Sequence, residues 1–210
     1  MSPIKMDRAR LLLIVMILLG TFSLSAHGQE LVILHTNDLH GQSLAQIATM
    51  VEELRTEHPD LLLVDAGDVF SGTPVSHLFK GEAEQKALLE LGYDAIALGN
   101  HDFDFGLDTV MRSFHEGVPW LSANILQDDG SSLVMPYIIK NVGSVRVMVI
   151  GLTTTATPRM SFPRNVAGLT FADPVTTLQD LLHRQEGAYD ICIVLSHLGY
   201  GDDLLLAQKV

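Results

Sequence analysis

Cysteine is almost absent from this chain of 210 residues, and positive charge is scarce. Cys192 is the only cysteine, so an intrachain disulfide is excluded. It lies within the apolar run Ile191–Leu195, and we interpret it as a small buried hydrophobic residue rather than a reactive thiol. The chain has 13 Lys and Arg against 25 Asp and Glu, a formal net charge of -12, which disfavours polyanionic partners such as nucleic acid.

Long apolar runs are also scarce, and the longest lies near the N-terminus. Residues 11–19 are all apolar, follow Lys5, Arg8 and Arg10, and precede small residues within 25–28. This order predicts a secretory signal peptide over residues 1–28, and hence a secreted or periplasmic protein. The run is too short to span a bilayer, which takes about 20 residues, so no stable span is expected after cleavage. An uncleaved anchor that extends through Leu24 is the alternative.

The remaining chain alternates short apolar runs with segments of helical periodicity. Strands are expected at 31–34, 61–64, 95–98, 120–123 and 191–195, and helices at 44–54, 82–91, 107–115, 174–185 and 202–209. A hairpin is expected at 137–150 and an exposed loop at 158–168. No repeat or linker interrupts this pattern, so we expect one α/β domain over residues 29–210, with parallel strands in its sheet.

Residue types that bind metals follow four of the expected strands. The segments are His35-Thr36-Asn37-Asp38-Leu39-His40, Asp65-Ala66-Gly67-Asp68, Gly99-Asn100-His101-Asp102 and Ser196-His197. Each alone is more often a turn, a helix cap or a hydrogen-bonded surface residue. Four together at the carboxyl ends of strands, where α/β sheets bind ligands, indicate a site at one edge of a sheet.

The donor types in these segments favour two divalent cations. Asp38 and His40 point the same way if the strand geometry persists, which suits one ion. Asp68 could bridge two ions, and Asn100 with His197 suits the second. Mixed oxygen and nitrogen ligands without thiolate favour Mn, Zn, Fe or Co. Two neighbouring ions can clamp a phosphate and activate water for attack.

These segments resemble the motifs of the calcineurin-like metallophosphoesterase superfamily, and the surrounding sequence is similar to its secreted 5′-nucleotidase branch. The likeness covers 31–210 and includes 34–38, 64–68, 71–73, 92–95, 98–104, 122–125, 151–154 and 195–199. The resemblance implies an α/β sandwich of two mixed β-sheets flanked by helices, with a dinuclear metal site at the strand ends.

The resemblance also implies a role for each matching residue. Asp38 and His40 would hold the first metal, Asp68 would bridge, and Asn100 and His197 would hold the second.

The catalytic imidazole implied by the resemblance is His101, which would stabilise the phosphoryl group and the leaving oxygen. Asp104 would orient His101. Asp102 stands where the branch often has Glu, and we interpret it as structural.

The implied function is metal-dependent hydrolysis of nucleotide phosphate esters of the 5′-nucleotidase type. Related family members act instead on 2′,3′-cyclic nucleotides, NAD, UDP-sugars or sulfur esters on a carrier protein. The family continues past Ser196-His197 with a strand ending in Gly-His-x-His, which adds one imidazole to each metal, and the branch adds a C-terminal domain that holds the base. The 210 residues contain neither, so a truncated domain is expected and a catalytically incomplete metal-binding remnant is the alternative.

Other notable residues have simpler interpretations. His35 is expected to pack on its strand or to support a ligand, and Asp65 to form a hydrogen bond behind Asp68. Phe103 and Phe105 are expected in the core. Four further histidines, His58, His77, His115 and His183, are interpreted as solvated or capping residues.

Overall fold

The computed structural model describes residues 30–210, so the signal peptide expected over 1–28 lies outside the described residues. The elements in chain order are β1 (Ile33–Thr36), α2 (Leu44–Glu57), β2 (Leu62–Asp65), α3 (Pro74–Phe79), α4 (Glu82–Leu91), β3 (Ala95–Ala97), η1 (His101–Phe103), α5 (Leu107–His115), β4 (Trp120–Leu121), β5 (Ile125–Gln127), β6 (Tyr137–Val142), β7 (Val145–Thr153), α6 (Thr157–Met160), η2 (Pro163–Val166), β8 (Leu169–Phe171), α7 (Pro174–Arg184), β9 (Ile191–His197) and α8 (Tyr200–Lys209). None of the helices within residues 30–210 has both the length and the apolar character needed to cross a bilayer.

The strands form two main sheets and one short ribbon. The first sheet has the order β1-β2-β3-β4 and is parallel throughout. The second has the order β6-β7-β9 and is mixed, because β6 and β7 form the expected hairpin while β9 runs parallel to β7. β5 and β8 form the antiparallel ribbon. The α/β sandwich expected from the sequence is confirmed, but the expectation of two mixed sheets is wrong for the first, whose strands all run parallel.

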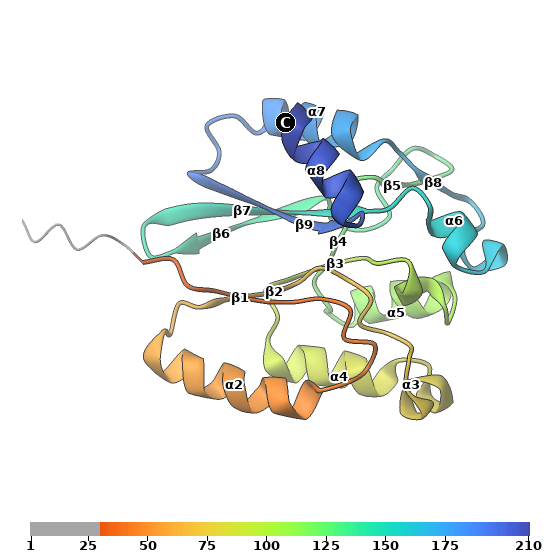
Figure 1. The fold of residues 1–210 in the computed structure, drawn as a ribbon, viewed down its shortest axis with the longest axis horizontal. Helices are drawn as coiled ribbons and strands as arrows, with labels where there is room; N and C mark the ends of the chain where they lie inside the picture. Colours follow the sequence, from red (N-terminus) through yellow and green to blue (C-terminus); the bar gives the residue numbers. More distant parts are fainter. Residues whose placement is uncertain (1–29) are drawn as a thin grey trace, which may run out of the picture. The chain divides into compact units, whose positions relative to one another are not determined.

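Four layers stack on one another, with α2 and α4 outside the first sheet and α7 and α8 outside the second (Figure 1). Successive strand residues point to opposite faces, and both faces here are apolar. Leu63 packs toward α2 and α4, whereas Leu62 packs against Val149 of the second sheet. Met148, next to Val149 in the strand, packs under α7 and α8. Each such side chain contributes roughly 2 kcal/mol when fully buried.

Local sequence signals explain several of the helix ends. Asp173 caps α7 by accepting the Thr176 amide at 2.8 Å, with Pro174 in the first turn, as expected. Gly92 ends α4 in the left-handed region at φ 65°, the expected C-cap. Thr73-Pro74 gives the same signal, a capping side chain followed by proline, and begins α3. The sequence analysis did not predict this helix.

Two expectations about the chain course are wrong. Residues 158–168 are mostly exposed, as expected, but they are not a loop, because they contain most of α6 and all of η2. Pro158 and Pro163 occupy first-turn positions, where proline is favoured, and start these two short turns. The four strand ends with metal-binding residue types also do not share one sheet: β1, β2 and β3 belong to the first, whereas β9 belongs to the second.

Candidate metal centre and adjoining histidine

The segment after β1 carries Asp38 and His40 in left-handed backbone conformations, with φ of 52° and 48°. Strand geometry ends at Thr36, so the expectation that the two side chains align through the pleat is wrong. Their side chains nevertheless come together, with Asp38 Oδ1 3.9 Å from His40 Nε2. The Asp38 amide donates to Gly67 O at 2.9 Å and the His40 amide to Asp68 O at 3.0 Å. Left-handed non-glycine residues cost about 1–3 kcal/mol each and cluster at functional sites.

The segment after β2 places Asp68 in the interior, 2% exposed and also left-handed, with φ 59°. Asp68 Oδ1 accepts the His101 amide at 2.7 Å, and Oδ2 lies 3.2 Å from His197 Nε2. Burial raises the pKa of Asp68, but the hydrogen bond and charge of His197 outweigh burial and lower it. Gly67 allows the close approach, because a Cβ there would lie 2.9 Å from His197 Nδ1.

His197 reaches this position from the end of β9, across the interface between the two sheets. Its Nδ1 lies 2.8 Å from Ala66 O, and since a carbonyl only accepts, Nδ1 donates and Nε2 faces Asp68. Burial lowers the pKa of His197, but the hydrogen bond and charge of Asp68 raise it overall to about 9. A metal ion bound at Nε2 of His197 would displace the proton that Nε2 carries in the charged imidazole.

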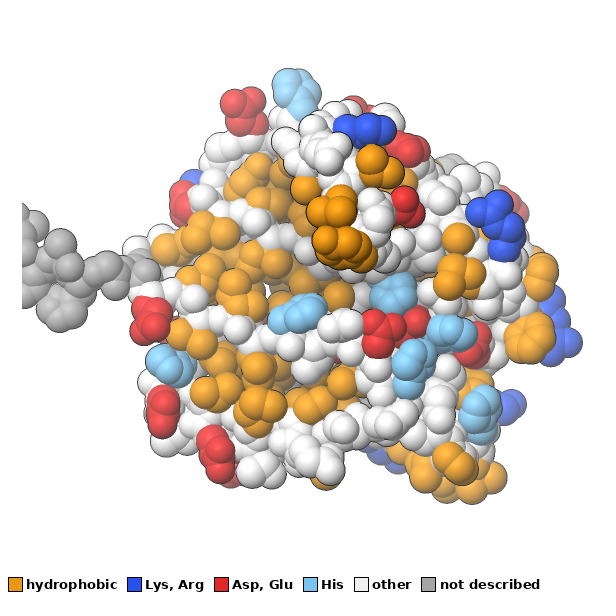
Figure 2. All heavy atoms as spheres, in the orientation of Figure 1, with side chains coloured by type: hydrophobic (Ala, Val, Ile, Leu, Met, Phe, Trp, Pro, Cys, Tyr) orange, Lys and Arg blue, Asp and Glu red, His pale blue; other side chains and the backbone are white. Residues whose placement is uncertain are grey.

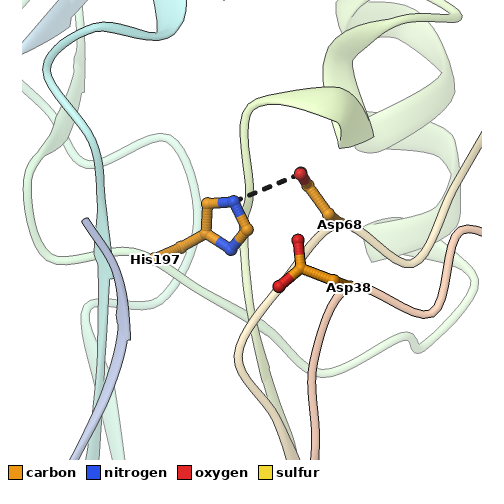
Figure 3. A group of neighbouring side chains, drawn as sticks. All are labelled: Asp38, Asp68 and His197. Carbon is orange, nitrogen blue, oxygen red and sulfur yellow. Dashed lines mark ion pairs between the residues drawn. The ribbon is translucent and has the colours of Figure 1, made fainter. Parts of the chain in front are cut away.

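Asp38, Asp68 and His197 form the candidate metal cluster. One ligand atom of each lies within 4.8 Å of the others, and the three side chains converge from different segments (Figure 3). The cluster opens into a cleft of about 640 Å³ between β1 and β9, whose lining includes Asp38, His197 and the exposed His35. Figure 2 shows acidic and histidine side chains gathered on this face between the two layers.

Asn100 directly follows Gly99 beside the cluster and is 2% exposed. Its side-chain Nδ2 is buried without a hydrogen-bond partner, and an unmet buried polar group costs about 1–3 kcal/mol. The two ends of an amide have nearly the same shape, so a half-turn of the side chain presents the oxygen instead. These features together fit a divalent cation site with oxygen and nitrogen ligands. They are the unpartnered amide of Asn100, the cluster of two carboxylates and one imidazole, and the left-handed backbone of Asp38 and Asp68.

His101 and Asp104 form a pair next to this cluster. His101 Nδ1 lies 2.8 Å from Asp104 Oδ2, across the short turn η1. The rings of His101 and His40 meet edge to face, with centroids 5.4 Å apart. Burial lowers the pKa of His101, but the hydrogen bond to Asp104 and nearby carboxylates raise it overall. The geometry leaves Nε2 of a half-buried imidazole free to act on a ligand bound at the cluster.

Asp102 holds the loops of the cluster in place, as the structural interpretation of this residue expected. Its Oδ2 accepts the amides of Asp68 and Gly99 at 3.0 and 2.8 Å, and Oδ1 those of Val69 and Phe70 at 2.9 and 3.0 Å. Burial and the charge of Asp68 raise the pKa of Asp102 to about 6.

Asp102→Asn is expected to destabilise the fold by about 2–4 kcal/mol, because the new NH₂ group faces amide donors that then lack an acceptor. Urea unfolding with chelator present at about pH 8, where the wild-type carboxyl is ionised, measures this loss. Asp128→Asn, on an exposed turn, is the matched control and should change stability by less than about 0.5 kcal/mol. A loss at Asp102 no larger than the control would contradict the anchoring role.

Asp65 lies behind Asp68, as expected, and is fully buried. It accepts the Thr36 hydroxyl and the Gly67 amide, each at 2.6 Å. Burial raises the pKa of Asp65 to about 7, although these hydrogen bonds oppose the shift. The folded state therefore binds the carboxyl proton of Asp65 more tightly than the unfolded chain does. Protonation of Asp65 stabilises the fold at low pH, and this stabilisation is lost as the pH rises through about 7.

Asp65→Asn is expected to weaken the pH dependence of stability in the metal-free protein. An asparagine can still accept from Gly67 and donate to the Thr36 hydroxyl. Between about pH 5 and pH 8 the wild-type free energy of unfolding should fall by about 2 kcal/mol more than that of the variant. Urea unfolding with chelator at both pH values measures the difference; equal falls in the two proteins would disprove the burial effect, because Asp102 contributes to both.

Two polar residues near His101 were not predicted from the sequence. Ser161 and Asn165 lie in the stretch expected to be an exposed loop, and they contact Asp104 and Phe103. These contacts join residues about 60 positions apart, which local patterns do not encode. Phe103 is fully buried in the core, as expected, and Phe105 packs partly buried against the same core.

Three comparisons with known proteins bear on this arrangement. The family model described as Calcineurin-like phosphoesterase matches residues 31–207. A snake venom 5′-nucleotidase from Gloydius brevicauda is 38% identical over 218 residues, covering 91% of this chain and 37% of the relative. The crystal structure of a 5′-nucleotidase precursor from Thermus thermophilus matches with a TM-score of 0.76 and 32% identity, covering 84% of this chain and 39% of that one.

A Haemophilus influenzae NAD nucleotidase structure also matches, with a TM-score of 0.76 and 26% identity over 84% of this chain and 36% of that one. This chain therefore spans well under half the length of each of these three relatives.

Proposed function

This chain belongs to the calcineurin-like phosphoesterase family, and from that premise we propose that it hydrolyses phosphate esters of nucleotides in the manner of a 5′-nucleotidase. The observation that carries the proposal is the convergence of Asp38, Asp68 and His197 beside the His101–Asp104 pair. The identity of 38% to a venom 5′-nucleotidase supports the substrate class.

The residues would divide between two divalent cations, drawn from Mn, Zn, Co and Fe. Asp38 and His40 would hold one ion, Asn100 and His197 the other, and Asp68 would lie between them. When bound, such ions neutralise phosphoryl charge and lower the pKa of water.

His101 would then act on the phosphate ester itself. A protonated imidazole beside the cluster can donate to a phosphoryl oxygen and to the leaving oxygen as charge develops there. Asp104 accepts from Nδ1 and so directs Nε2 toward the substrate.

Hydrolysis of added nucleotides by this chain, measured with and without Mn²⁺ or Zn²⁺, tests this function. Released phosphate measures hydrolysis of nucleoside 5′-monophosphates, whereas chromatography of the products measures hydrolysis of phosphodiester and pyrophosphate compounds, which release no phosphate in the first step. We expect metal-dependent hydrolysis of nucleoside 5′-monophosphates to exceed that of a 2′,3′-cyclic nucleotide, a UDP-sugar or NAD. The last of these is the substrate named for the Haemophilus relative. Metal-loaded protein that hydrolyses neither these compounds nor an aryl phosphate would contradict the proposal.

We also propose that the mature protein is secreted or periplasmic. The basic and apolar N-terminal stretch supports export, and several relatives are venom proteins. N-terminal sequencing of material exported by cells should find a new terminus near Gln29; an intact Met1 in that material would contradict cleavage.

A further inference from the structure

The segment formed by α6 and η2 lies against the turn that carries His101 and Asp104. Asn165 Nδ2 donates to two consecutive carbonyls, Phe103 O at 2.8 Å and Asp104 O at 3.0 Å. The Ser161 hydroxyl donates to Asp104 Oδ1 at 3.4 Å. The segment therefore contacts both the backbone and the side chain of the residue that faces His101.

The turn η1 needs such support, because it contains only three residues. Carbonyls at the end of a short 3₁₀ turn have no partner within the turn. Phe103 O also accepts the Gly106 amide at 2.9 Å, and Asn165 adds a donor to Phe103 O and supplies one to Asp104 O. The backbone position of Asp104 sets where its carboxylate meets His101 Nδ1.

The segment is itself fixed to the strand ends of the second sheet. Thr157 is fully buried and donates its hydroxyl to Thr154 O at 2.7 Å, and the Ser161 amide donates to Thr157 O at 2.9 Å. The Thr154 amide donates to His197 O at 3.0 Å. These hydrogen bonds, connected through the backbone of residues 154–161, thus link His197 at the end of β9 to Asp104 after η1.

We propose that Asn165, assisted by Ser161, is a positioning residue for the His101–Asp104 pair. It acts through Asp104, because its side chain donates to Phe103 O and Asp104 O rather than to a residue of the metal cluster. Its loss should therefore lower turnover while leaving cation and substrate binding unchanged. This inference rests on the proposed phosphoesterase function.

Asn165→Asp is the central variant, because it keeps the shape of the side chain and replaces the donor with a carboxylate that repels the two carbonyls. With Mn²⁺ bound, we expect kcat to fall about 10- to 100-fold, while KM and the Mn²⁺ affinity measured by calorimetry change less than about twofold. Asn165→Ala should lower kcat similarly, and Ser161→Ala only severalfold, because it leaves the carbonyls of η1 paired.

The leaving group separates positioning from a general loss of structure. Stabilisation of the leaving oxygen by His101 matters most for a poor leaving group. The fall in kcat should therefore be larger for a nucleoside 5′-monophosphate than for nitrophenyl phosphate. Arg164→Ala is the matched control, since Arg164 lies in η2 next to Asn165 and is exposed beside Phe162. It should leave kcat within about twofold of wild type.

A second readout does not depend on turnover. The proton on His101 Nδ1 should give a downfield NMR signal, identified by its absence in His101→Gln. We expect this signal in wild type and Arg164→Ala and its loss or shift in Asn165→Asp. A wild type without turnover would contradict the proposed function, and the NMR comparison would then decide the positioning role. An unchanged signal, a kcat within threefold of wild type, or equal loss with both leaving groups would overturn the role of Asn165.

Discussion

His101→Gln is expected to lower kcat by about 10²- to 10⁴-fold while Mn²⁺ binding stays within about twofold of wild type. Glutamine can donate a hydrogen bond, but it carries no ionisable proton and no positive charge for the leaving oxygen. The imidazole lies outside the cluster of Asp38, Asp68 and His197, and the contact from this residue to Asp68 is made by its backbone amide. That amide is unchanged by the substitution, so the loops should keep their positions.

Steady-state phosphate release and calorimetry with Mn²⁺ measure the two effects in the same preparation. His183→Gln in α7 is the control, because His183 is exposed on the outer helix layer of the second sheet. Turnover of His101→Gln within threefold of wild type would exclude a catalytic role. Loss of Mn²⁺ binding together with turnover would instead make His101 part of the metal site.

Asp68→Asn is expected to weaken Mn²⁺ binding on the order of 100-fold or more, because even residues that only support metal ligands cost 10- to 100-fold when replaced. Asparagine has the same shape and can still accept the His101 amide, but it removes the negative charge between the two proposed ions. In the metal-free protein it also removes the ion pair with His197. We therefore expect the pKa of His197 to fall back toward its ordinary value.

Calorimetric titration with Mn²⁺ measures the affinity, and NMR titration of His197 in the metal-free variant measures its pKa. Asp60→Asn, an exposed carboxylate in the turn before β2, controls for the loss of one negative charge. Unaltered Mn²⁺ affinity in Asp68→Asn would remove Asp68 from the ligand set. The same affinity loss in the Asp60 control would point to overall charge rather than to a ligand.

Much of the candidate site follows from local sequence and one rule of sheet geometry. Asp38, Asp68 and Asn100 each come within four residues of the end of a short apolar strand, and the carboxyl ends of parallel strands meet at one edge. That rule places these three residues together without any knowledge of the tertiary structure. The His101–Asp104 contact also follows from a three-residue separation in a tight turn.

Other features depend on contacts that no local pattern contains. His197 reaches the cluster from the second sheet, which requires the two sheets to pack face to face through Leu62, Val64 and Val149. The backbone at Asp38 and His40 is left-handed rather than extended, and their amides donate hydrogen bonds to the carbonyls of Gly67 and Asp68 in the loop after β2. The support from Asn165 likewise depends on where α6 and η2 pack.

We propose that this fold holds two divalent cations side by side at Asp68. Anomalous diffraction from crystals soaked in Mn²⁺, recorded at the manganese absorption edge, tests it most directly. We expect two peaks flanking the Asp68 carboxylate, one next to Asp38 and His40 and the other next to Asn100 and His197. No peak at this cluster, or manganese bound only elsewhere on the surface, would contradict the account.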